Sequence, residues 1–280
     1  MTNKLMSVLT AAVLYASNPA ASNAQDDLSV TLPLPSGANP QIAAHLTQAS
    51  LIVVAADVSE VIVEATFNAD EMVDEAEQTD DGFTIINSSG LAFDARTDGD
   101  TLVIDAGSWE TETYVTIQVP ANIALKAWSN QGDYIRVSGM SGDLELSSNG
   151  GDIVLEDVSG HIVADASNGD LIVDWVGSNP TQPMAFTSRN GDVDVSFPDD
   201  LRATLKLQTR YGSVKTAFEV SNQRTVVDQT GESDRVRVES WTQADINGGG
   251  PELTMRTFHG DLVIRNSRTV RPPAGSASAE

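Results

Sequence analysis

The sequence contains no cysteine, which excludes disulfide bridges and thiolate metal sites. Histidine is nearly as scarce: only His45, His161 and His259 occur, and no two of them have the spacing of zinc ligands. No Gly-x-Ser-x-Gly elbow is present, so the nucleophile of that class of hydrolase is missing. These absences predict a non-enzymatic protein that is stabilised by burial alone.

Basic residues are few as well, with 16 Lys and Arg against 40 Asp and Glu, a formal net charge of −24. Phosphate groups bind to basic faces, so this charge argues against nucleic acid or an anionic lipid surface as a partner. No apolar run approaches the ~20 residues that a membrane-spanning helix requires. The sequence therefore predicts a protein without a membrane span, whose partner is a protein or a glycan.

The N-terminus has the pattern of a secretory signal peptide. Lys4 supplies a positive charge, residues 5–16 form an apolar stretch, and Ser22-Asn23-Ala24 is a small-x-small cleavage site. The apolar stretch is too short for a membrane anchor, and Pro19 would end a helix soon after it. We expect residues 1–24 to be removed and the mature chain to be periplasmic or extracellular.

One pattern recurs six times along the rest of the chain: apolar-x-apolar-x-small-x-x-Gly, a polar residue, and then a second alternating segment. The glycines of the six copies are Gly132, Gly151, Gly169, Gly191, Gly212 and Gly260. Alternation at period two predicts strands, and we expect each glycine to supply the positive φ of a tight turn. The first five glycines are 19, 18, 22 and 21 residues apart, which predicts coils of about 19 residues with two strands each.

Copies of this size cannot bury an apolar face alone, but stacking them ~4.8 Å apart buries a continuous one. The predicted fold is therefore an all-β parallel β-solenoid. An antiparallel sandwich also alternates strands and turns, but it has no reason to repeat its side-chain pattern at a fixed period. In the solenoid, Leu146, Ile153, Leu171 and Val193 should face the interior, whereas Asp194 should face outward and tolerate polar replacement.

Three segments follow the signal peptide in this interpretation, and the second contains an excursion. Residues 25–120 form a β-rich leading section that covers the first coil, and residues 121–267 form the solenoid. Residues 219–250 interrupt the repeat as an excursion that adds a strand, and residues 268–280 form a disordered tail.

Several of these features resemble the putative-adhesin family of bacterial envelope proteins. They are the segment Val115-Thr116-Ile117-Gln118-Val119-Pro120, the Ser-x-x-Gly-Asp units, and the ending Gly248-Gly249-Gly250-Pro251-Glu252-Leu253. The resemblance extends over roughly residues 100–267. It implies an exported envelope β-solenoid with a role in adhesion or envelope stress, and it brings no catalytic residues.

The aspartates that follow four of the repeat glycines are the only candidate ion ligands. Stacked coils would place Asp133, Asp152, Asp170 and Asp192 in one column, about 5 Å apart. Ligands made only of oxygen favour calcium over zinc. A bare solvated column is the alternative, since like charges at that distance in water repel by only about 0.8 kcal/mol. We expect no cofactor, and weak calcium binding at most.

Aromatic side chains are a further candidate for surface contacts. Trp128 and Trp175 are assigned to outward positions of their strands, where their rings could stack on a sugar. Scattered exposed aromatic residues also occur without any function. The acidic run at residues 68–81 is best interpreted as a solvated loop, because it lacks the ligand spacing of an EF-hand.

Three functions are consistent with these features. The first is a non-enzymatic, adhesin-like module of the envelope or cell surface that presents flat β faces to a protein or glycan. The second is an envelope-stress or signalling component that binds another exported protein. The third is a glycan-active β-helix enzyme, which would need two carboxylates facing each other across a cleft.

Overall fold

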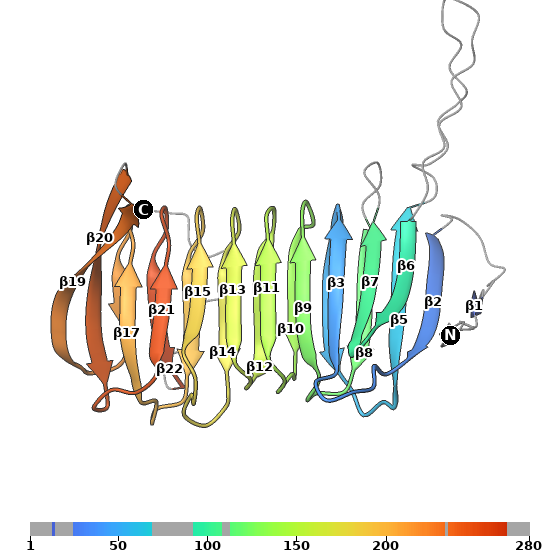
Figure 1. Cartoon of the computed structure of the whole chain (residues 1–280), viewed down its shortest axis with the longest axis horizontal. Coiled ribbons are helices and arrows are strands. Elements are labelled where there is room, and N and C mark those ends of the chain that lie inside the picture. The colour runs from blue at the N-terminus through green and yellow to red at the C-terminus, as the bar shows by residue number, and fades with distance from the viewer. Residues whose placement is uncertain (1–12, 15–24, 69–91, 108–112, 233–234, 268–280) are drawn as a thin grey trace, which may run out of the picture.

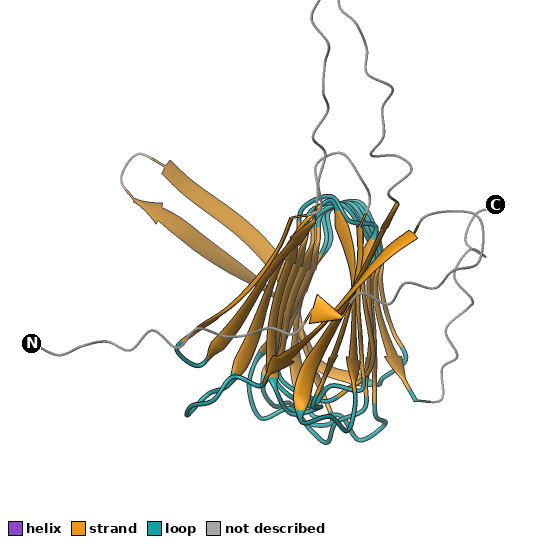
Figure 2. Ribbon diagram, turned by 90° about the vertical axis from the view of Figure 1, so that its right-hand side faces the viewer, coloured by secondary structure: helices purple, strands orange, loops and turns teal. Residues whose placement is uncertain are grey.

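The computed structural model of the chain describes residues 13–14, 25–68, 92–107, 113–232 and 235–267. Every regular element in these ranges is a β-strand, and none of the described residues belongs to a helix that is long and apolar enough to cross a membrane. The strands form two 11-stranded sheets that face each other across a shared core (Figures 1 and 2). The expected all-β solenoid, built mostly of parallel strands, is confirmed.

Each coil contributes one strand to each sheet. Sheet A contains β10 (Tyr134–Ser138), β12 (Asp152–Val158), β14 (Leu171–Trp175) and β16 (Val193–Phe197). Sheet B contains β9 (Ala124–Ser129), β11 (Leu144–Ser148), β13 (Ile162–Ala166) and β15 (Met184–Ser188). Pairing between coils is parallel and in register, so Leu125, Leu144 and Ile162 occupy the same position in successive strands of sheet B.

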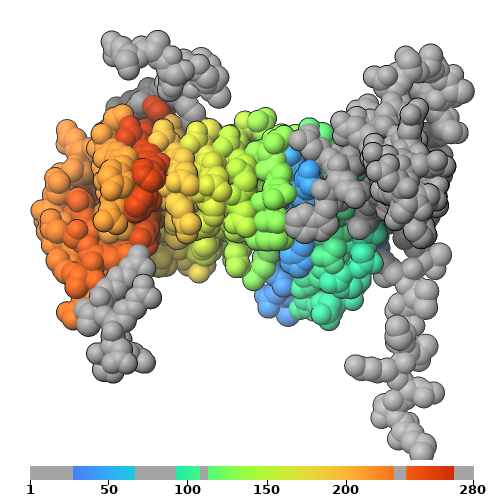
Figure 3. Space-filling model, turned by 90° about the horizontal axis from the view of Figure 1, so that it is seen from above, coloured from blue at the N-terminus to red at the C-terminus, as the bar shows by residue number. Residues whose placement is uncertain are grey.

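The order of the coils in space differs from their order in the chain. The last coil, β21 (Glu252–Arg256) and β22 (Leu262–Asn266), lies between the β15/β16 coil and the preceding coil in the chain, β17 (Ala203–Gln208) and β18 (Val214–Thr216). Figure 3 shows this insertion as a red segment between the yellow and orange ones. The final repeat thus returns into the stack and does not extend it.

The other end of the stack has the same arrangement. The coil β3 (Gln41–Thr47) and β4 (Ala49–Ala55) lies between the coil β7 (Thr101–Gly107) and β8 (Thr113–Val119) and the coil β9/β10. The leading section therefore adds two coils to the solenoid in addition to covering it. Its coils lack the repeat glycine, and the corner between β3 and β4 is made by Gln48, which has a φ of 48°.

Antiparallel strands close both ends of the stack. At the N-terminal end β2 (Gln25–Pro33) and β5 (Glu60–Asn68) extend sheet A, and β6 (Ala92–Asp98) extends sheet B. β1 (Val13–Leu14) pairs with β2, whereas the rest of the expected signal peptide and the tail at 268–280 lie outside the described residues.

At the C-terminal end the expected excursion is a hairpin of two strands, β19 (Val220–Glu232) and β20 (Arg235–Ile246). β20 pairs with β17 and so extends sheet B, and the hairpin projects from the body of the molecule (Figure 2). Because β20 pairs with β17, the last coil strand of sheet B has no unpaired edge.

The corner glycines are required by close packing of the backbone, and the expectation of positive φ is wrong for most of them. Among the six repeat glycines only Gly260 has a positive φ, of 153°. A Cβ atom added to Gly151 would lie 2.0 Å from the carbonyl oxygen of Asp133 in the neighbouring coil, and one on Gly132 would lie 2.0 Å from that of Ala49. Glycine is therefore the residue that lets one corner stack directly on the next.

The interior positions agree with the predicted alternation. Leu146, Ile153, Leu171 and Val193 are all buried in one continuous hydrophobic core. Asp194 does lie on the outer face, but it is not freely exposed: its side chain is only 14% accessible and forms an ion pair with Arg265. This ion pair replaces the expected tolerance of Asp194 with an expectation that polar replacement destabilises the fold.

The assignment of Trp175 to the outer surface is also wrong. Trp175 is only 4% exposed, and its ring packs against Phe197 with the ring centroids 5.7 Å apart. It lies two residues after the buried Val173 on the same strand, so it shares the inward face of Val173. Its indole Nε1 donates a hydrogen bond to the carbonyl oxygen of Gly160 at 3.1 Å, which satisfies the one polar group of the ring.

Candidate binding surface

A row of side chains crosses the outer face of sheet B from one end of the stack to the other. Its members occupy one register position on neighbouring strands, which lie ~4.8 Å apart. In spatial order they are Asp94, Asp105, His45, Trp128, Ser147, Asp165, Thr187, Arg256 and Gln208. None of them is buried. We call this set the outer row; it joins residues that are far apart in the sequence into one continuous surface.

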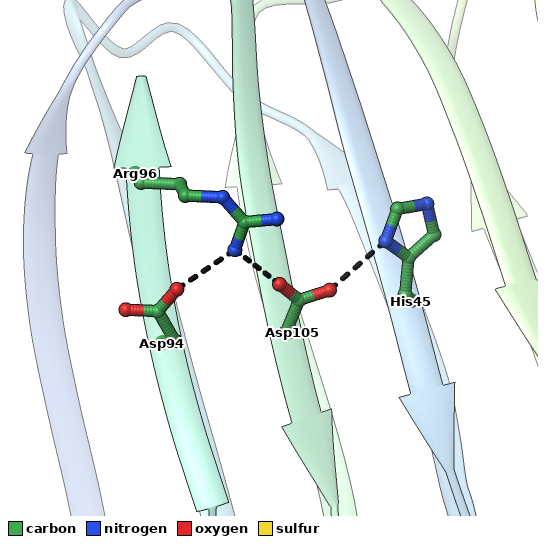
Figure 4. Close-up of polar contacts among 4 residues, drawn as sticks. All are labelled: His45, Asp94, Arg96 and Asp105. Carbon is green, nitrogen blue, oxygen red and sulfur yellow. Dashed lines mark hydrogen bonds and ion pairs between the residues drawn. The ribbon is translucent and has the colours of Figure 1, made fainter. Parts of the chain in front are cut away.

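Four residues form a polar cluster at the N-terminal end of the outer row (Figure 4). His45 Nδ1 lies 2.9 Å from Asp105 Oδ1, and Arg96 Nη1 donates to Asp94 Oδ2 at 2.8 Å and also to Asp105 Oδ2. Three adjacent strands of sheet B, β3, β7 and β6, therefore hold one hydrogen-bonded chain of side chains. Sequence analysis missed this cluster because His45 is about 50 to 60 residues from the other three members and no local motif links them.

The protonation of the cluster follows from the charges around Asp105. Partial burial raises the pKa of Asp105, but the hydrogen bonds from Arg96 and His45 outweigh that effect and hold it below its ordinary value. An ionised Asp105 can only accept hydrogen bonds, so His45 carries its proton on Nδ1 and donates it. The other ring nitrogen, Nε2, is left for contact with a ligand.

Trp128 is the neighbour of His45 in the outer row, in the register pairing of β3 with β9. Its side chain is 39% exposed, which agrees with the outward position expected for it. The arrangement thus offers an aromatic surface beside fixed hydrogen-bonding groups. Of the other tryptophans, Trp241 is buried and Trp109 lies outside the described residues.

The four candidate calcium ligands do lie in one column, and three of their carboxylates accept a hydrogen bond from a main-chain amide of the neighbouring coil. Oδ1 of Asp152 accepts a hydrogen bond from the amide of Asp170, and Oδ1 of Asp170 accepts one from the amide of Asp192, each at 2.8 Å. At Asp133 the amide of Asp152 binds the main-chain carbonyl oxygen instead, at 3.0 Å. Aspartate therefore recurs after the repeat glycines because its carboxylate accepts a hydrogen bond from a backbone amide at the corner of the neighbouring coil.

Asp261 extends this column beyond the point where the sequence analysis ended it. The amide of Asp261 donates to Oδ1 of Asp192 at 2.7 Å, and the amide of Ser213 donates to Oδ1 of Asp261 at 2.7 Å. Asp261 holds this place because the last coil inserts before the β17/β18 coil. Within the described ranges no group of three or more His, Asp or Glu residues is placed to hold a metal ion, and calcium binding by the column stays a prediction.

These features define a class of protein: a two-sheet parallel β-solenoid with a long, flat outer face that carries aromatic and charged side chains. The chain belongs to the Toastrack family (DUF4097), whose model matches residues 24–246. This match confirms the family resemblance that the repeat units indicated.

Two solved structures are similar to the chain, and both come from bacteria. A putative cell adhesion protein from Clostridium sporogenes has 8% sequence identity and a TM-score of 0.48, over 86% of this chain and 99% of that one. A putative adhesin from Bacteroides fragilis has 10% identity and a TM-score of 0.27, over 86% of this chain and 97% of that one. No curated protein is significantly similar to the chain.

Proposed function

We propose that this protein is a non-enzymatic binding module of the bacterial envelope or cell surface. It is adhesin-like, and it holds a glycan or a protein on the outer face of sheet B. The observation that carries the proposal is the outer row, in which Trp128 lies between His45 and Ser147 on a rigid sheet. The signal-peptide pattern in residues 1–24 supports export, and the similar adhesion proteins support a surface role.

The chemistry around Trp128 suits a sugar. An exposed indole offers a flat apolar surface to one face of a pyranose ring, while neighbouring polar side chains bind its hydroxyl groups. His45 and Asp105 are already held by hydrogen bonds, so little side-chain freedom is lost when a ligand binds. The strands that carry these residues are paired on both sides, which keeps the surface in one shape.

A second candidate function is a signalling or envelope-stress component that binds another exported protein. The observation that favours it is the projecting hairpin, where Val227 is 60% and Val238 62% exposed. Both valines lie on one face of the hairpin, because Val227 pairs with Ser240 and Gln229 pairs with Val238. Two exposed valines on one face of a projecting hairpin suit contact with a protein better than contact with a sugar.

The arrangement of carboxylates supports a binding role over glycan cleavage. Asp94 and Asp105 lie on adjacent strands of one sheet, and Arg96 bridges them. Glycosidases place two carboxyl groups on opposite sides of the scissile bond, in a cleft that holds the sugar between them. On the outer row the two carboxylates instead form ion pairs with the same guanidinium.

The experiment that tests this proposal compares two aromatic residues of similar exposure on opposite sheets. Binding of the mature chain to purified envelope polysaccharide is measured for Trp128→Ala and Tyr114→Ala, whose side chains are 39% and 41% exposed. We expect at least a tenfold loss of affinity for Trp128→Ala and little change for Tyr114→Ala, which lies on sheet A. Equal affinity of Trp128→Ala and the unaltered chain would contradict the proposed surface.

A further inference from the structure

The outer row ends in a groove at the C-terminal part of sheet B. Two adjoining hollows of about 590 and 450 Å³ share Arg256 and Phe258 in their walls. The first is also lined by Asp165 and Arg189. The second is also lined by Arg210, which follows β17, and by Glu239, which lies in strand β20 of the projecting hairpin. We call the two hollows together the arginine groove, after Arg189, Arg210 and Arg256.

The charge of the arginine groove is opposite to that of the protein as a whole. Acidic residues outnumber basic ones by 40 to 16 in the chain, yet the walls of the groove carry three arginines against Asp165 and Glu239. Partial desolvation raises the pKa of Asp165, although the nearby charge of Arg189 lowers it. An anionic group in this groove meets a local excess of positive charge.

Two of the arginines have free hydrogen-bonding groups. Arg256 is held in place, because it donates to Glu239 Oε1 at 3.1 Å and lies over the ring of Trp241 at 5.7 Å. By contrast, no hydrogen bond or ion pair among the described residues engages the side chain of Arg189 or of Arg210. A guanidinium presents a planar fork of donors that fits a carboxylate in two-point contact.

Exposed aromatic rings lie beside these arginines. The ring of Tyr211 stacks on that of His259 at 4.9 Å, and Phe258 meets both rings edge-on, at 5.4 and 4.6 Å between centroids. Arg210 lies over Phe258 at 5.3 Å, so the charged and the aromatic groups form one cluster. Tyr211 remains 61% exposed and Phe258 37%, which leaves ring surface available to a ligand.

We propose that the arginine groove binds an acidic glycan, a polysaccharide whose sugars carry carboxylate groups. Arg189 and Arg210 pair with the carboxylates, and the rings of Tyr211 and Phe258 pack against the sugar faces. This inference rests on the proposed function, since it names the ligand class for one end of the same outer face. An acidic peptide fits less well: β13, β15, β21 and β17 are each paired on both sides and offer no free edge to a peptide backbone.

The test uses the mature chain and three soluble polymers: polygalacturonate, neutral dextran and polyglutamate. Calorimetry or affinity electrophoresis should show binding to polygalacturonate that weakens as salt is added. The double variant Arg189→Gln/Arg210→Gln should lower that affinity at least tenfold. Arg136→Gln is the matched control, because Arg136 also lies over an aromatic ring, that of Tyr134 at 6.0 Å, but on sheet A. Its affinity should not change.

Several results would overturn the inference. Polyglutamate bound as tightly as polygalacturonate would identify an acidic protein as the ligand class, and dextran bound equally well would remove the role of the carboxylate. Absence of polygalacturonate binding at low salt would also contradict it. If Trp128→Ala abolishes binding to envelope polysaccharide while the double arginine variant behaves as the unaltered chain, the inference fails and the proposed function stands. Equal thermal unfolding of the variants confirms that the fold is retained.

Discussion

At the scale of single residues, the close stacking of the corners gives the repeat glycines their role. A side chain on such a glycine cannot be accommodated by a rotamer change, because the atom it meets is the main-chain oxygen of the next coil. The rest of the corner is fixed in the same way: the amide of Gly151 donates to Ser148 Oγ at 3.1 Å, and Ser188 Oγ donates to the carbonyl oxygen of Gly169 at 2.9 Å. Local sequence therefore determines how closely the coils approach.

Replacement of Gly151 by alanine tests this role of the corner. The added Cβ atom would lie 2.0 Å from the Asp133 oxygen, so the two coils must separate locally, at a cost of about 1–3 kcal/mol. Gly150→Ala is the control, because its Cβ atom meets nothing closer than 3.3 Å. Denaturant unfolding should show the loss for Gly151→Ala only. Similar stability of the two variants would mean that the corners are not packed as described.

The ion pair between Asp194 and Arg265 provides a second test at this scale. Arg265 Nε lies 2.8 Å from Asp194 Oδ1 and Nη2 lies 2.8 Å from Oδ2, and both side chains are more than four-fifths inaccessible. Asp194→Asn leaves the guanidinium partly buried without its counter-charge, so we expect a loss of about 2–3 kcal/mol. Lys126 and Glu145 form an exposed pair, and Glu145→Gln should cost less than about 1 kcal/mol. Equal losses measured by thermal unfolding would contradict this difference.

At the scale of elements, the sequence predicted the strands of the repeats better than their order. Alternation and the glycine register identify each strand pair, because both are local properties of the chain. The insertion of β21/β22 before β17/β18, and of β3/β4 after β7/β8, depends on which sheet edges pair in the folded molecule. No local pattern encodes that choice. The outer row was missed for the same reason, since its register follows from the order of the coils.

The edge strand β18 should respond to acid through Asp261. The hydrogen bond from Lys215, together with that from the amide of Ser213, holds the pKa of Asp261 below its ordinary value. A carboxyl group with a lowered folded-state pKa stabilises the fold above its unfolded pKa of about 3.9. That contribution is lost as the pH falls through the lower pKa of the folded state.

The matching measurement is unfolding stability between neutral pH and acid for the unaltered chain and for Asp261→Asn. We expect the variant to be less stable at neutral pH by no more than about 1 kcal/mol, since the contact is partly exposed to solvent. The difference should disappear in acid, and Asp143→Asn should not reproduce it. A difference that is constant across the pH range would exclude a role for the charge of Asp261.

At the scale of the whole molecule, the two ends of the stack differ from the outer faces of its sheets. The ends of the stack are protected by the antiparallel strands β2, β5 and β6 at one side and by the β19/β20 hairpin at the other. Sheet A ends in β18, a strand of three residues that carries Lys215, and short charged edge strands resist pairing with other chains. Under the proposed function, the ligand therefore binds the outer face of sheet B and not an end of the stack.

The most direct test of this account is a side-chain footprint of the mature protein with and without purified envelope polysaccharide. Radical labelling measures the accessibility of aromatic side chains on both sheets. The account predicts that the ligand protects Trp128, on the outer face of sheet B, and Tyr211, at the corner after β17. Tyr114 and Tyr134, on sheet A, should be unchanged. Protection of Tyr114 and Tyr134 with no protection of Trp128 and Tyr211 would contradict it.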